Sequence, residues 1–165
     1  MSAADLIVLT QTSPLLELFT VDITAKASSA PILRFCNYSQ VNGASISFNS
    51  FQFAAYPIEA TGFEKSINGT LPTPELSVSN IFSDISSLIL TYSGMLDAKV
   101  TRIKVLAKNL DGEPGANPAE IESTDIYYIS RYSENSLFVK FSLRHPLDMG
   151  KLFLPKRRLA SLTGD

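Results

Sequence analysis

A single stretch of this chain has helical spacing, and this restricts the fold to one built mainly from strands. Asn80 or Ser83 can cap the start of the helix, Asp84 suits the positive end of its dipole, and Gly94 is a natural stop. We therefore expect one helix of about three turns that packs on a sheet. Its apolar stripe, at the 3.6-residue period, consists of Ile81, Ile85, Leu88, Ile89 and Tyr92.

Short runs of alternating apolar and polar residues occupy most of the remaining chain and predict eight to ten strands. A tight hairpin is expected around Asn49-Ser50, and Asn42-Gly43 is a second turn signal. The segment from Tyr56 to Ala60 is expected to continue the second strand of this hairpin, and Pro57, which lacks a backbone donor, belongs at an edge or a bulge. The expected architecture is a β-barrel, or two packed antiparallel sheets, with one flanking helix. The predicted strands cover residues 16–24, 32–36, 46–48, 51–53, 56–60, 63–67, 76–79, 100–106, 126–132 and 137–143.

The chain divides into an arm, one domain and a short tail. Its 165 residues suffice for a single domain with its own core. We assign residues 1–13 to an N-terminal arm, 14–158 to the β domain and 159–165 to a C-terminal tail. Residues 109–123 form a long loop rich in turn-forming pairs. Loops of this length inside a compact domain usually have a function.

Composition excludes several classes of protein. With 45% hydrophobic and 18% charged residues, general disorder is excluded, and a net charge of −2 argues against a wholly polyanion-binding surface. The single cysteine, Cys36, excludes a disulfide framework and a cysteine-based metal site, and it suits a reducing cytosol. No run is long enough to cross a bilayer, and the acidic start is unlike a signal peptide. We expect a cytoplasmic product without membrane insertion.

Catalytic signals are weak, and we predict no enzyme activity, no catalytic residue, no cofactor and no metal. His145 would need an unidentified serine partner, so a satisfied surface histidine is favoured. Cys36 lies within a strand and is interpreted as a small buried hydrophobe. The acidic residues near the long loop could meet a cation, but a solvated loop is favoured. They are Glu113, Glu120, Glu122 and Asp125.

Basic residues recur along one predicted strand and again near the end of the chain. A nucleic-acid interface would need aromatic residues interleaved with these cations, and that pattern is weak here. A solvated strand face or ion pairs between subunits are favoured instead. The cations are Lys99, Arg102, Lys104 and Lys108 on the strand, and Lys156, Arg157 and Arg158 in the tail.

Several blocks of residues follow one another in a fixed order along the chain. They are residues 58–64, 69–80, 97–102, 125–131, 133–135, 146–148 and 154–158, and the last reads Leu154-Pro155-Lys156-Arg157-Arg158. In their order and spacing, the blocks resemble the minor tail protein L family of long-tailed bacteriophages. The resemblance extends from about residue 16 to residue 158.

The resemblance implies a structural, non-enzymatic component of the phage tail tip or baseplate. Its domain would be related to tail-tube proteins, a β-barrel with a flanking helix. Copies would form a homo-oligomeric ring, a trimer or a hexamer, between the distal tail protein and the central hub protein. The ring would continue the tail-tube channel, with DNA present only in transit. The protein would be made in the host cytoplasm and reside in the virion.

One departure from the family concerns a cofactor. Many members continue into a cysteine-bearing domain that holds an iron–sulfur cluster. A cluster needs about four thiolates, and this chain has Cys36 alone. We therefore predict no cluster, and the chain is either a short member or one truncated at a domain boundary.

The long loop, the arm and the basic tail are the expected contacts between subunits or rings, because they lack apolar periodicity. Three alternatives stay open: a carbohydrate- or protein-binding β-sandwich, a small hydrolase, and an oligomeric protein unrelated to phage. The absence of tryptophan weakens the carbohydrate alternative. The candidate contact residues are Asp111, Glu113, Pro114, Asn117, Arg157 and Arg158.

Overall fold

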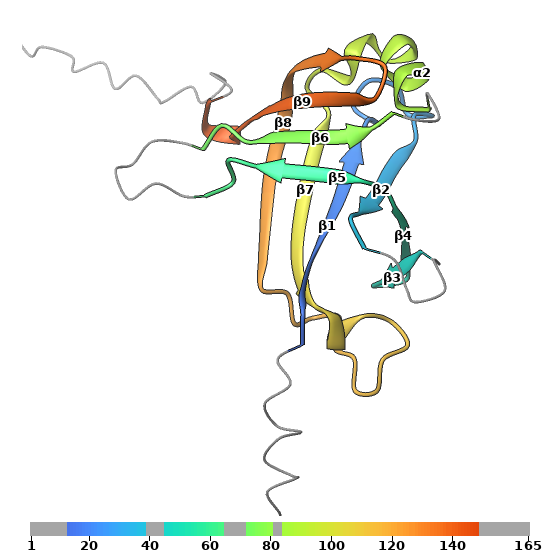
Figure 1. The fold of residues 1–165 in the computed structure, drawn as a ribbon, viewed down its shortest axis with the longest axis vertical. Coiled ribbons are helices and arrows are strands. Elements are labelled where there is room, and N and C mark those ends of the chain that lie inside the picture. Colours follow the sequence, from blue (N-terminus) through green and yellow to red (C-terminus); the bar gives the residue numbers. More distant parts are fainter. Residues whose placement is uncertain (1–12, 39–44, 65–71, 81–83, 149–165) are drawn as a thin grey trace, which may run out of the picture.

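Nine strands form one sheet in a computed structural model that describes residues 13–38, 45–64, 72–80 and 84–148 (Figure 1). The order across the sheet is β3-β4-β2-β1-β7-β8-β9-β6-β5. Every neighbouring pair is antiparallel except β2 and β4, which are parallel. The strands are β1 (Leu15–Asp22), β2 (Ile32–Cys36), β3 (Ile46–Phe48), β4 (Phe51–Ala55), β5 (Ile58–Thr61), β6 (Glu75–Ser79), β7 (Lys99–Leu106), β8 (Ser123–Glu134) and β9 (Phe138–Arg144).

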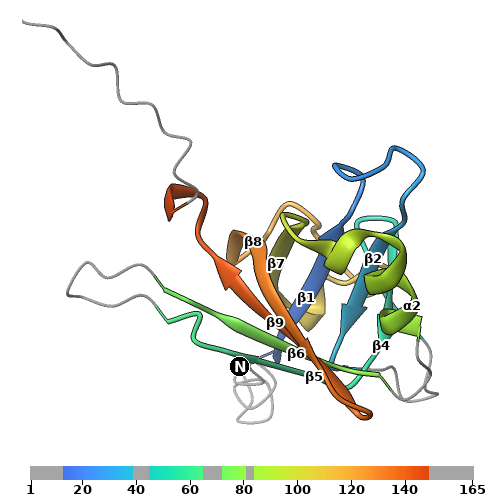
Figure 2. The ribbon, with the colours of Figure 1, turned by 90° about the horizontal axis from the view of Figure 1, so that it is seen from above.

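The long strand β8 bends the sheet over on itself. Its first half pairs with β7 and its second half pairs with β9, and the register shifts between Ile129 and Arg131. An irregularity of this kind bends a strand and increases its twist. Figures 1 and 2 show the result, in which β5, β6 and β9 cross over β1 and β7. One continuous sheet therefore supplies both layers of the domain.

The main core fills the space between these two layers. Period-two alternation directs Phe19 and Val21 of β1 into it, and the other strands contribute in the same way. Phe63, just beyond β5, joins them and packs edge-on against Tyr127 at 5.3 Å between ring centroids. The buried strand residues of this core are Phe19, Val21, Phe35, Ile58, Leu76, Val78, Val100, Tyr127, Ile129, Val139, Phe141 and Leu143.

A second apolar cluster lies on the opposite face of β1 and β7, under the β3–β4 hairpin. Asn49 and Ser50 have positive φ values of 51° and 64°, as a two-residue hairpin turn requires. This turn folds the hairpin over the outer side of β1. The buried residues of this cluster are Leu16, Leu18, Cys36, Ile46, Phe48, Phe53 and Val105.

Helix α2 (Asp84–Thr91) covers one end of the main core. Ile85 and Ile89 are buried, as the apolar stripe predicts, whereas Ile81 lies outside the described residues. The eight described residues of α2 make about two turns, and the predicted start of the helix at residues 81–83 lies outside the described residues. A 3₁₀ turn, η1 (Ser93–Met95), follows the helix, and Gly94 has a φ of 74° with the Tyr132 ring packed over it. Glycine suits this position, because the φ is positive and a Cβ atom would force the Tyr132 ring to move.

The predicted mainly β fold is confirmed, with one flanking α-helix among the described residues, and the described strands do not close into a barrel. Two strand predictions need correction. The segment from Tyr56 to Ala60 does not continue β4, since that strand ends at Ala55 and β5 begins at Ile58 in the other layer. Residues 63–64 are not in a strand, because β5 ends at Thr61 and Gly62 follows it with a φ of 73°. The predictions for Asn42-Gly43, residues 1–12, 65–71 and 149–165 lie outside the described residues. No helix in the described ranges is long and apolar enough to cross a membrane.

Candidate assembly surface

The long loop projects from one end of the domain (Figure 1). Hydrogen bonds of Asp111 anchor it there. The Asp111 carboxylate accepts hydrogen bonds from the Ser47 hydroxyl at 2.8 Å and from the backbone N–H groups of Asn49 and Ser50 at 3.0 and 2.8 Å. Its own N–H donates to the Ser47 carbonyl at 3.0 Å. These bonds, the one from Ser50 foremost, lower the pKa of Asp111. Asp111 therefore fastens the loop to the edge strand β3.

The remaining candidate residues of the loop are free to meet a partner. Glu113, Pro114 and Asn117 are all exposed. The Asn117 side chain is used only locally among the described residues, where its Oδ1 accepts a bond from Ala119 N–H at 3.1 Å and its Nδ2 donates to Glu120 at 3.4 Å. Asp111 thus has an intramolecular role that the sequence did not indicate, and the other three form an exposed tip.

The N-terminal entry to the domain lies beside the same loop. The Pro14 carbonyl accepts a bond from Ala107 N–H at 2.9 Å, and the Ser13 hydroxyl accepts one from Lys108 N–H at 2.9 Å. We call this region, made of residues 13–14 and 107–122, the loop end. The arm therefore leaves the domain at the loop end, whereas Arg157 and Arg158 lie outside the described residues.

Arg102 is buried and paired within the subunit, whereas the sequence predicted a solvated strand face or ion pairs between subunits. It is 7% exposed and forms ion pairs with Glu17 of β1 and with Asp125 of β8, the latter at 3.7 Å. Its guanidinium lies 4.4 Å from the Phe63 ring centroid, within cation–π distance. Lys104 adds a longer contact to Glu17 at 3.6 Å. Arg102 therefore joins three strands inside one subunit.

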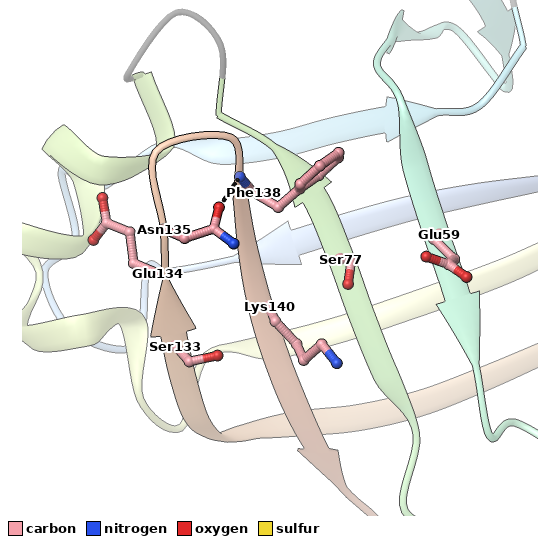
Figure 3. Close-up of a pocket in the computed structure, with 7 residues that line it drawn as sticks. All are labelled: Glu59, Ser77, Ser133, Glu134, Asn135, Phe138 and Lys140. Atoms are coloured by element: carbon pink, nitrogen blue, oxygen red, sulfur yellow. Dashed lines mark hydrogen bonds between the residues drawn. The ribbon is translucent and has the colours of Figure 1, made fainter.

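The outer face of β5, β6 and β9 is polar and carries a shallow surface hollow (Figure 3). The Asn135 Oδ1 atom accepts bonds from the N–H groups of Leu137 and Phe138 at 2.9 and 2.7 Å, which orders the β8–β9 turn. Leu137 and Phe138 are 59% and 47% exposed on that turn. The hollow is lined by Glu59, Ser77, Ser133, Glu134, Asn135, Phe138 and Lys140.

His145 and Cys36, the two residues considered for catalysis, both make contacts that stabilise the fold. The His145 ring packs edge-on against Tyr127 at 5.9 Å, and its Nδ1 accepts a bond from Leu147 N–H at 3.2 Å. Cys36 is fully buried, its thiol donates to the Tyr38 carbonyl at 3.1 Å, and burial raises its pKa. Cys36 is the small buried residue that the sequence predicted. Within the described ranges, no three His, Cys, Asp or Glu side chains gather closely enough to hold a metal ion.

These features define a class of protein: a structural β module with an open sheet, a projecting loop and an exposed turn. The family model described as Phage minor tail protein L matches residues 25–164. The chain belongs to this family, and it is therefore a tail structural protein and a component of the phage virion. It is similar to the "Tail tip protein L" of Escherichia phage lambda, with 29% identity over 136 residues. The match covers 78% of this chain and spans about 58% of the relative's length.

The iron–sulfur cluster that the family resemblance implies does not fit the residues present. Cys36 is the single cysteine of the chain, and its thiol is buried beneath the β3–β4 hairpin. A cluster held by about four thiolates has no ligand set in one copy of this chain.

Proposed function

We propose that copies of this protein form a ring at the tail tip that continues the tail-tube channel. The similar protein of phage lambda is a tail tip protein by name, which supports the position proposed here. The ring would lie between the distal tail protein and the hub protein, and DNA would cross it during ejection. A trimer and a hexamer are both compatible with this role.

The observation that carries the proposal is the open sheet. Among the described strands, β3 and β5 lie at its two ends and do not pair with each other. Exposed strand edges invite pairing with another chain, and natural proteins cover them. Asp111 covers the edge of β3 from within the subunit, whereas β5 has a largely open edge. A subunit with one blocked and one open edge favours a directed contact over uncontrolled aggregation.

The loop end supplies a second contact in this proposal. Head-to-tail contacts between different patches close into a ring when the rotation between subunits permits it. Glu113, Pro114 and Asn117 project at the tip of the loop and would meet a neighbouring subunit or ring. Asp111 would act indirectly, by holding the loop in position. Arg157 and Arg158 stay as predicted contacts of the basic tail.

The contact with DNA would be passive. Each phosphate that a protein neutralises adds salt-dependent affinity and would slow passage of the DNA. The chain carries a net charge of −2, and the most buried of its strand cations, Arg102, is already paired with carboxylates. We expect no measurable binding of double-stranded DNA at physiological salt in a fluorescence anisotropy titration.

The test uses deletion of residues 113–119, which removes the exposed tip and keeps Asp111. Negative-stain imaging and light scattering should show rings for the intact protein and monomers for the deletion. Circular dichroism should show the same folded sheet in both. Lys108→Ala is a matched control, since it changes an exposed ion pair at the base of the loop and should still assemble.

Two outcomes would contradict the proposal. Rings of unchanged size from the deletion variant would remove the role of the loop. Absence of the protein from purified virions, measured by mass spectrometry, would remove the tail-tip role itself.

A further inference from the structure

The edge of β5 has an unpaired backbone segment. Ser79 N–H donates to the Pro57 carbonyl at 3.0 Å, so in this register Glu59 and Thr61 direct their backbone groups toward β6. Ile58 and Ala60 direct theirs away from the sheet. The Asn37 side chain caps the Ile58 N–H at 3.4 Å, but the N–H and C=O of Ala60 have no partner among the described residues.

The two faces beside this edge differ in polarity. Ile58 is 8% exposed and Ala60 packs against the main core, so their side chains lie on the inner face. Glu59 and Thr61 are exposed on the outer face. A strand added beside β5 would therefore place alternate side chains at the rim of the core.

We propose that Leu6-Ile7-Val8-Leu9 of a neighbouring copy adds to β5 as an extra strand. This inference rests on the proposed ring, because it requires a second copy of the chain. The apolar run has four residues, which matches the four residues of β5. A run without alternation is typical of a strand covered on both faces, here by the core rim and by the neighbour. Addition of a strand to an open edge is a general mode of recognition.

The anchoring of the arm favours a neighbouring copy as its acceptor. Ser13 and Pro14 are held at the loop end, where β1 begins (Figure 1). Only residues 10–12 separate Ser13 from Leu9, so even fully extended the run from Leu9 to Leu6 lies within about 25 Å of Ser13. In a ring, an adjacent copy can present its β5 edge within this reach.

The test crosslinks two full-length proteins, one carrying Val8→Cys and the other Glu59→Cys, with a short bismaleimide. Cys36 stays in both, because its thiol is buried. We expect a covalent heterodimer in the mixture. Adding Ala60→Pro to the second protein should reduce the yield about tenfold, since proline removes the outward N–H and obstructs pairing. Ala60→Val keeps the N–H and is the matched control.

Ala60→Pro should leave the subunit folded, because the Ala60 N–H is not used in pairing with β6. Thermal unfolding of the uncrosslinked variant checks this. A crosslink that is insensitive to Ala60→Pro in a folded variant would overturn the inference, and so would a crosslink formed within one chain carrying both cysteines.

Imaging by negative stain distinguishes failure of strand addition from failure of the proposed ring. Rings without the heterodimer would refute strand addition alone, whereas the heterodimer without rings would refute the ring alone.

Discussion

Replacing Arg102 by methionine tests whether its buried ion pairs hold the first layer of the sheet together. The Arg102 side chain is 8% exposed, and its partners Glu17 and Asp125 are 28% and 17% exposed. Methionine keeps the apolar stem but leaves both carboxylates without their common partner. Breaking a buried pair in this way costs about 3–5 kcal/mol. We expect a loss of about 3 kcal/mol, at the low end of that range, since Lys104 still contacts Glu17.

The free energy of unfolding is measured by urea denaturation, with thermal unfolding as a second measure. For a domain of this size, a loss of that magnitude lowers Tm by about 6–12 °C. The matched control is Lys108→Met, which breaks an exposed pair with Glu120 whose side chains are 57% and 56% exposed. That control should change stability by less than about 0.5 kcal/mol.

A rescue variant separates charge from packing. In the Arg102→Met background, Glu17→Gln together with Asp125→Asn removes the uncompensated charges and should restore at least about half of the lost stability. The reasoning is refuted if Arg102→Met lies within about 1 kcal/mol of the intact protein, since surface pairs behave in that way. It is also refuted if neutralising the two carboxylates restores nothing.

Three further changes test single features of the fold. Gly94→Ala should destabilise the protein by about 1–3 kcal/mol in urea denaturation, because φ is 74° and the Tyr132 ring occupies the space of a Cβ atom. An unchanged urea midpoint of unfolding would contradict this packing. Asp111 has a lowered pKa in the folded state, so the stability it contributes is present above its ordinary pKa and is lost as pH falls through the folded value. An NMR titration should place the Asp111 carboxyl pKa below the ordinary value of about 3.9. The Ser50 amide signal should shift with this titration, and Asp111→Asn should abolish that shift. A carboxyl that titrates at the ordinary value would contradict the anchoring role of Asp111. The Cys36 thiol should react with Ellman's reagent at least about 100-fold more slowly in the native protein than in denaturant. The reason is that burial raises the pKa of the thiol and blocks access of the reagent. Equal rates would show that the β3–β4 hairpin does not cover Cys36.

Local periodicity in the sequence determined the elements and their faces. Alternation of apolar and polar residues predicted β1 and the hairpin of β3 and β4, and Asn49 and Ser50 form the turn of that hairpin with positive φ values. The helical stripe identified Ile85 and Ile89 as core residues. These features could be predicted because each depends on neighbours a few residues apart. The family resemblance likewise rested on ordered local blocks.

Contacts between distant segments were decided by the tertiary structure. Asp111 lies 64 residues from Ser47, and Arg102 lies 85 residues from Glu17. A charged residue on a strand has the same local pattern whether its partner is water or a carboxylate on another strand. The pairing order of nine strands sets that partner, and so it also sets which edge stays open. The sequence by itself therefore determined a mainly β tail protein with one helix. Only the assembled sheet decided that Asp111 anchors a loop, that Arg102 is buried, and that β5 is left with an open edge.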